Sequence, residues 1–420
     1  MKLFGETSIY FGANIINAAI PFLLLPILTR VLTPAEYGTV AIFLVMVGLF
    51  SSVTGLSVHG AVGVRYFQLS EDDFSDYVSS CVGILILSTV LTLLILIMFQ
   101  DWVVELSGLS IDWLIIAVLT SGAQFLINIR LSIWQVSGCA WKYGGLQISR
   151  SILDAFFSLV LLFGFGMAWQ GRLLGIFNSV VLISTIGAFW LYKDGFLRKP
   201  KIWIEHAYNA LNFGLPLIPH AVGGMLIVVT DRVLINKILG IESVGIYTVA
   251  IQAGMVIGLV VESFNKAYAP WLYKRLESNS EIANRKIVRF TYAYFIIIIF
   301  FGVIYGLAAP KILSLLVGDE FLAAGELIIY TSLGFALSGC YYMVTNYIFF
   351  SNKNGYLAIL SFFAATLNIP ITYFLLITQG IVGAAMAYFF ISLLIFLCTW
   401  LIASRTHKMP WFSWLQSERN

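Results

Sequence analysis

The chain has 420 residues, of which 60% are apolar and only 11% are charged, and its formal net charge is +3. A soluble domain carries roughly a quarter charged residues, so this composition excludes a cytosolic globular enzyme. The small and dilute net charge argues against a nucleic-acid binder, and the 15% of aromatic residues excludes a disordered chain. The class of protein that remains is a membrane protein that crosses the bilayer several times.

Taken in chain order, twelve stretches are long and apolar enough to cross a bilayer as helices, each of which needs about 20 residues. Their apolar runs are continuous rather than alternating, which disfavours a β-barrel. The predicted spans are 9–29, 39–64, 78–99, 112–135, 147–168, 171–192, 210–231, 244–266, 287–308, 326–350, 355–377 and 380–402. We therefore expect an all-α integral membrane protein.

The basic residues predict the orientation of these spans, because loops on the cytoplasmic side carry an excess of Lys and Arg. If the N-terminus is cytoplasmic, most of the 24 basic residues fall on or near that side. The exceptions are Arg30, Arg172, Arg232, Lys237 and Lys311. We predict that both termini are cytoplasmic.

The two halves of the chain repeat each other weakly. RVLTPAEYG at 30–38 matches KILGIESVG at 237–245, which aligns Arg30 with Lys237 and Gly38 with Gly245. Such a duplication predicts two six-helix lobes around a central cavity, related by an axis along the membrane normal. The expected division is a first lobe at 1–192, a cytoplasmic linker at 193–209, a second lobe at 210–404 and a cytoplasmic tail at 405–420.

Each half begins with a helix that contains two prolines. Because proline removes a backbone donor and clashes one turn back, both helices are expected to bend and to act as hinges. The alternative is that these prolines have no special role, since proline is common in membrane helices. The residues are Pro21 and Pro26 in the first half and Pro216 and Pro219 in the second.

Three stretches resemble a known family. PFLLLPILTRVLTPAEYGTVAIF at 21–43, FGLPLIP at 213–219 with TDRVLINKILGIESVGIYTVA at 230–250, and ATLNIPITYFLLITQGIVGAAMA at 365–387 are similar to segments of polysaccharide flippases. These are the Wzx-type O-antigen transporters of the multidrug/oligosaccharidyl-lipid/polysaccharide exporter superfamily. The resemblance implies a carrier that moves undecaprenyl-pyrophosphate-linked oligosaccharide across the bacterial inner membrane, from the cytoplasmic to the periplasmic leaflet, for O-antigen or capsule synthesis.

The same resemblance implies the partners. We expect the lipid-linked oligosaccharide, membrane lipids and the polysaccharide polymerase with its chain-length machinery, and no nucleic acid. We expect no enzymatic activity, cofactor or metal, since the sequence has no P-loop and no His-Glu-x-x-His. Two alternatives stay open, namely a drug/cation antiporter of the same superfamily and a membrane polysaccharide polymerase or glycosyltransferase.

Basic residues near the cytoplasmic ends of the spans are candidates for binding the substrate headgroup. A pyrophosphate carries negative charge and is recognised by guanidinium and ammonium donors. The alternative is that these side chains reach the membrane interface and only set the topology. The predicted cationic vestibule consists of Arg65, Arg130, Arg150 and Lys266.

Carboxylates within the spans are candidates for ion coupling, because a buried carboxylate can bind and release a proton or Na⁺. These are Asp154, Asp231 and Glu262, and the alternative is structural pairing with Arg150, Arg232 and Lys266. Neutral polar residues at membrane depth are candidates for lining the cavity, or equally for bonding neighbouring helices. The candidate cavity residues are Asn14, Asn17, His59 and His220.

Overall fold

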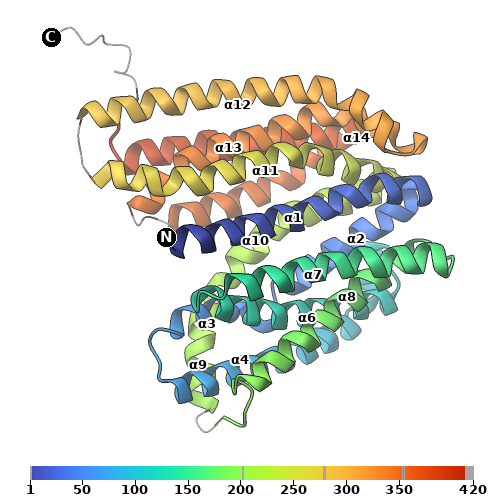
Figure 1. Ribbon diagram of the computed structural model, residues 1–420. Coiled ribbons are helices and arrows are strands. Elements are labelled where there is room, and N and C mark those ends of the chain that lie inside the picture. The colour runs from blue at the N-terminus through green and yellow to red at the C-terminus, as the bar shows by residue number, and fades with distance from the viewer. Residues whose placement is uncertain (1, 201–202, 278–280, 352, 354, 412–420) are drawn as a thin grey trace. The chain divides into compact units, whose positions relative to one another are not determined.

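The computed structural model describes residues 2–200, 203–277, 281–351, 353 and 355–411, and none of these residues lies in a β-strand. The described chain is helical almost throughout, which confirms the all-α expectation (Figure 1). It forms two compact units, Met1–Lys237 and Ile238–Asn420. The segment that begins the repeated second half, from Trp203 onward, belongs to the first unit. The repeat-based division at 193–209 stays a prediction.

The first unit contains the first seven predicted spans. Its helices are α1 (Lys2–Val31), α2 (Pro34–Ser51), η1 (Thr54–Ser57), α3 (His59–Arg65), α4 (Glu71–Met98), α5 (Gln100–Ser107), α6 (Ile111–Val136), α7 (Ala140–Leu159), η2 (Val160–Gly164), α8 (Trp169–Lys193), α9 (Trp203–Gly214), η3 (Leu215–Leu217) and α10 (Ile218–Leu239). The π-helical η2 continues α7, and the short α5 was not predicted. α6, α7 and α8 pack side by side (Figure 1).

The loop after α1 shows how the sequence starts a helix. Thr33 caps α2, since its hydroxyl accepts a hydrogen bond from the Glu36 amide at 3.3 Å. The Glu36 carboxylate in turn accepts from the Thr33 amide at 2.9 Å, which completes a capping box. Pro34 occupies the first helical position, where a missing backbone donor costs nothing.

The second predicted span is broken rather than continuous. α2 ends at Ser51, and Gly55, Leu56 and Ser57 have φ values of 72°, 49° and 57°. Leu56 and Ser57 occupy a left-handed region that non-glycine residues rarely adopt. The Ser88 hydroxyl of α4 accepts a hydrogen bond from the Gly55 amide at 2.8 Å. This bond satisfies one backbone donor that the break in the helix would otherwise leave unpaired.

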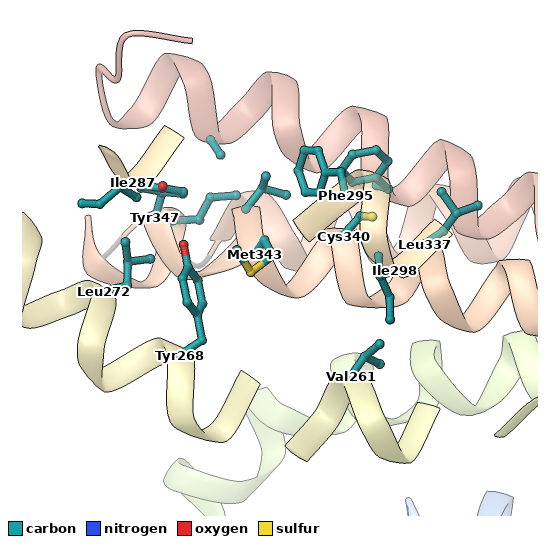
Figure 2. Packing of buried hydrophobic residues seen from close by; sticks show 14 of the residues in the cluster. Val261, Tyr268, Leu272, Ile287, Phe295, Ile298, Leu337, Cys340, Met343 and Tyr347 are labelled. Atoms are coloured by element: carbon teal, nitrogen blue, oxygen red, sulfur yellow. The ribbon is translucent and has the colours of Figure 1, made fainter. Parts of the chain in front are cut away.

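The second unit consists of α11 (Ile241–Glu277), α12 (Glu281–Leu316), η4 (Asp319–Leu327), α13 (Ile328–Phe350) and α14 (Gly355–Thr406). Its core lies between α11, α12, α13 and the C-terminal part of α14. Tyr268, Phe295, Met343 and Tyr347 point into this cluster, which Figure 2 shows from close by. Across the described residues, ten helices are long and apolar enough to span a membrane, and Ala19–Val31 adds a shorter apolar helix.

α14 contains the last two predicted spans, separated by a sharp turn. Gly380 has φ 59° and ψ −143°, which is not helical. A Cβ at Gly383 would overlap the Leu375 carbonyl group and lie 3.0 Å from the Leu376 amide nitrogen. In a straight helix residues 375 and 383 are about 12 Å apart, so the chain folds back at Gly380. Glycine is required at 380 for its positive φ and at 383 for this close approach.

Candidate functional site

α7 carries a stripe of polar side chains on one face of an otherwise apolar helix. At 3.6 residues per turn its members fall within about a third of the helix circumference, and the opposite face exposes Ile152 and Phe156. α7 packs against α1 and α8. The α7 polar stripe consists of Tyr143, Gln147, Arg150, Ser151, Asp154 and Ser158.

An ion pair joins the α7 polar stripe to α8. Arg172 Nη1 donates to Asp154 Oδ1 at 2.6 Å, and its Nη2 donates to Oδ2 at 3.1 Å. Arg172 Nη1 also donates to the Ser158 hydroxyl at 2.6 Å. The two side chains of the pair are 9% and 22% exposed. This fork geometry is the stronger form of an arginine–carboxylate contact.

Arg150 lies one helical turn from Asp154, and the charges of the two side chains attract each other. Because Arg172 already occupies both Asp154 oxygens, the three groups together carry one surplus positive charge. Among the described residues no carboxylate forms an ion pair with Arg150. α7 begins at Ala140, earlier than the predicted 147, so Arg150 lies about 15 Å along the helix rather than at its start.

The other side of the α7 polar stripe meets α1. The Ser151 hydroxyl donates a hydrogen bond to Asn17 Oδ1. Asn17 therefore contacts the α7 polar stripe. Its role as a cavity residue stays a prediction, because the same contact holds two helices together. The side chain of Asn14 lies outside the described residues.

Arg130 has a different environment from Arg150. Its side chain is 1% exposed, it pairs with Asp194 just after α8, and its guanidinium lies 4.2 Å from the centre of the Trp134 ring. Arg65, at the end of α3, donates to Asn209 Oδ1 at 2.9 Å and to Gln68. Arg65 and Arg130 thus have partners that differ from each other and from the residues around Arg150.

The remaining charged candidates are paired or buried. In the second unit Lys266 Nζ lies 2.8 Å from Glu262 Oε1, and both side chains are about half exposed. This is the pairing that the alternative interpretation expected. In α10, Asp231 and Arg232 are both buried, and Arg232 Nη1 lies 3.4 Å from the Val228 carbonyl oxygen.

The candidate histidines and hinges occupy varied positions. His59 begins α3 and packs edge-on against Phe125 at 5.1 Å, and the side chain of His220 lies outside the described residues. Pro216 and Pro219 lie where η3 separates α9 from α10. α1 is continuous through Pro21 and Pro26, and the hinge role of all four prolines stays a prediction.

The sequence did not identify the partners of two polar residues, one in each unit. Arg172 was counted only as a basic residue outside the cytoplasm, because nothing local links it to Asp154 on the preceding helix. In the second unit, Asn346 donates to Asn265 Oδ1 at 2.9 Å and accepts from the Tyr273 hydroxyl at 3.2 Å. Asn346 is 4% exposed, and this network joins α11 to α13.

The loop after α8 is fastened to the start of α4. Arg198 Nε donates to Asp76 Oδ1 at 2.6 Å, and Nη1 donates to Asp72 Oδ1 at 2.7 Å. The Ser79 hydroxyl donates to the Phe196 carbonyl and accepts from the Arg198 amide. These hydrogen bonds to two carboxylates raise the pKa of Arg198.

Comparison with known proteins shows which family the chain belongs to. The family model described as "Polysaccharide biosynthesis protein" matches residues 3–276. The "Lsg locus putative protein 1" of Haemophilus influenzae is 26% identical over 84% of this chain and 86% of its own length. The "Probable low-salt glycan biosynthesis flippase Agl15" of Haloferax volcanii is 21% identical over 90% of this chain and 78% of its own length.

Solved structures agree on the fold. A lipid II flippase MurJ in an inward closed conformation covers 96% of this chain and 87% of its own, with 15% identity and a TM-score of 0.74. A MATE family multidrug resistance transporter of the MOP superfamily, in an inward-facing conformation, covers 96% and 98%, with 15% identity and a TM-score of 0.67. The chain is a multi-pass membrane protein, and it belongs to the polysaccharide biosynthesis protein family.

Proposed function

We propose that the protein flips undecaprenyl-pyrophosphate-linked oligosaccharide repeat units from the cytoplasmic to the periplasmic leaflet, by alternating access, for O-antigen or capsule synthesis. Both termini then lie in the cytoplasm of a bacterial cell, and the protein resides in the inner membrane. The observation that carries this proposal is the surplus positive charge of Arg150 within a helix that is long and apolar enough to span a membrane.

An uncompensated arginine at membrane depth needs an explanation. On insertion scales it costs about 2.5–3.5 kcal/mol at the helix centre, so such residues face a water-filled cavity or an anionic partner. Asp154 does not supply the missing partner, because Arg172 holds both of its oxygens. A pyrophosphate fits this position, since its oxygens accept paired guanidinium hydrogen bonds. A cationic drug does not fit, because the surplus charge would repel it.

The names of related proteins support the same class of substrate. Agl15 is described as a glycan biosynthesis flippase and MurJ as a lipid II flippase. Both descriptions name a flippase, one for glycan biosynthesis and the other for lipid II. At their level of identity the MurJ and MATE structures support the fold, and the choice of substrate depends on the chemistry of Arg150.

The other vestibule residues divide into two groups under this proposal. Arg65 has only neutral hydrogen-bond partners among the described residues and keeps its charge for an anion. Arg130 and Lys266 each pair with a carboxylate, and we assign them to holding their helices. For ion coupling we propose Asp231 as the first carboxylate to test, because it is 2% exposed, whereas Asp154 is already paired with Arg172.

A strain that depends on this gene for surface polysaccharide tests the proposal. Arg150→Gln should reduce surface polysaccharide by about tenfold or more, because a charge-assisted contact worth about 1.4 kcal/mol or more is lost. Unflipped lipid-linked units should accumulate, and Arg150→Lys should restore part of the transport. Lys142→Gln is the matched control, since Lys142 lies on the same helix, off the polar stripe and exposed. Normal polysaccharide from a fully inserted Arg150→Gln protein would refute the proposal.

A further inference from the structure

The first unit contains an apolar cleft that is separate from the α7 polar stripe. It has a volume of about 970 Å³ and lies between α2, α4, α5, α9 and α10. The largest share of its wall is one face of α4, whose lining residues recur every three or four positions, as one face of a helix requires. They are Ile84, Leu87, Ser88, Leu91, Thr92, Ile95, Leu96 and Phe99.

The two hydroxyl groups in the wall of the cleft, those of Ser88 and Thr92, are already hydrogen-bonded. The Ser88 hydroxyl accepts from the Gly55 amide at 2.8 Å and donates to the Leu85 carbonyl at 3.0 Å. The Thr92 hydroxyl donates to the Ser88 carbonyl at 2.8 Å, which leaves its methyl group for the cleft. An occupant of this cleft must therefore be hydrocarbon.

The cleft is longer than one leaflet of a membrane. From Ile84 to Phe99 the α4 face extends about 22 Å, whereas one leaflet of a hydrocarbon core about 30 Å thick provides about 15 Å. Trp203, whose Nε1 would lie 2.9 Å from a Cβ on Gly83, lines one end, and Trp102 lines the other. Tryptophan is typical of both membrane interfaces. A long chain that crosses the bilayer midplane fits this cleft better than the acyl chain of a phospholipid.

Polar groups, among them a basic residue with neutral hydrogen-bond partners, lie just beyond the Trp203 end. Tyr77 lies two turns before Ile84 on α4, and its ring meets His206 of α9 edge-on at 5.8 Å. The buried Tyr77 hydroxyl and His206 Nε2 have no hydrogen-bond partner of regular geometry among the described residues. The Tyr77 hydroxyl interacts electrostatically with Arg65, which is bonded to Asn209 of α9. A phosphate placed here would supply acceptors for these donors.

We infer that this cleft docks the polyprenyl-phosphate part of the lipid-linked substrate, with the isoprenoid chain along α4 and the phosphate at Arg65. The inference rests on the proposed function, and it adds a second lipid contact apart from Arg150. The long apolar cleft selects the isoprenoid chain, and Arg65 at its end selects the phosphate.

Native mass spectrometry of the purified protein with added undecaprenyl phosphate tests this inference. Leu91→Trp and Ile95→Trp fill the cleft with bulky rings and should lower occupancy by about tenfold or more. Both sites are exposed, so the folded protein tolerates the larger ring. Leu94→Trp is the matched control on the same helix, because Leu94 is exposed and does not line the cleft. Arg65→Gln should weaken binding of undecaprenyl phosphate and leave binding of undecaprenol unchanged.

Two results would overturn the inference. Equal displacement of undecaprenyl phosphate by phosphatidylglycerol or by farnesyl phosphate would show that the cleft only holds bulk lipid. Equal binding by the Leu91→Trp, Ile95→Trp and Leu94→Trp proteins would show that the chain lies elsewhere. Neither result bears on the proposed function, since Arg150→Gln reports on flipping and is expected to bind undecaprenyl phosphate at the cleft normally.

Discussion

The Asp154–Arg172 pair should stabilise the first unit, and Asp154→Asn is the most informative change. It leaves Arg172 with neutral acceptors alone, Ser158 and the new amide oxygen, and it removes the negative charge that offsets Arg172. Breaking a buried ion pair by removing one partner costs about 3–5 kcal/mol. Because the Asp154 side chain is 22% exposed, we expect the lower end, about 3 kcal/mol.

A double-mutant cycle separates the pair from its surroundings. Asp154→Asn, Arg172→Gln and the double variant can be unfolded in mixed micelles by increasing detergent, with helicity followed by circular dichroism. We expect a coupling energy of about 2 kcal/mol, because each single variant leaves one charge without its partner. The matched control is the exposed Glu262–Lys266 pair, which should couple by less than about 0.5 kcal/mol. Equal coupling energies for the two pairs would refute this reasoning.

Three further predictions concern other parts of the chain. Gly383→Ala should destabilise the α14 hairpin by about 2 kcal/mol or more in a thermal melt, because its methyl group overlaps the chain. Arg198→Ala should speed proteolysis of the loop that Arg198 fastens to Asp76, whereas Lys199→Ala should not. Burial lowers the pKa of His407 below its ordinary value of 6.5. Acid therefore favours the unfolded state, so stability should fall as the pH drops below about 6.5, and less so in His407→Gln.

The fold was largely predictable, because a continuous apolar run of about 20 residues marks each membrane span. The runs at 355–377 and 380–402 were separated correctly, since Gln379 and Gly380 interrupt them and Gly380 adopts a positive φ. The break in the second span was not predictable. Hydropathy reports depth in a membrane, whereas the left-handed Gly55–Ser57 turn depends on packing with α4 and α6.

The candidate site was only partly predictable. The spacing of Arg150 and Asp154 placed both residues on one face of a helix, as the structure has them. The partner of Asp154 was not predictable, because Arg172 reaches it only through the packing of α7 on α8. The same limit applies to the apolar cleft, since every residue in its α4 wall looks like ordinary lipid-facing surface in the sequence.

Flipping by purified protein in liposomes tests the central claim most directly. A polyprenyl-pyrophosphate-linked oligosaccharide can be placed in one leaflet, and its arrival in the other leaflet can be measured with an added sugar-modifying enzyme. The account predicts rapid transfer by the wild-type and Lys142→Gln proteins and about tenfold or more slower transfer by Arg150→Gln. Equal transfer by wild-type protein and protein-free liposomes, or by wild-type and Arg150→Gln proteins, would contradict it.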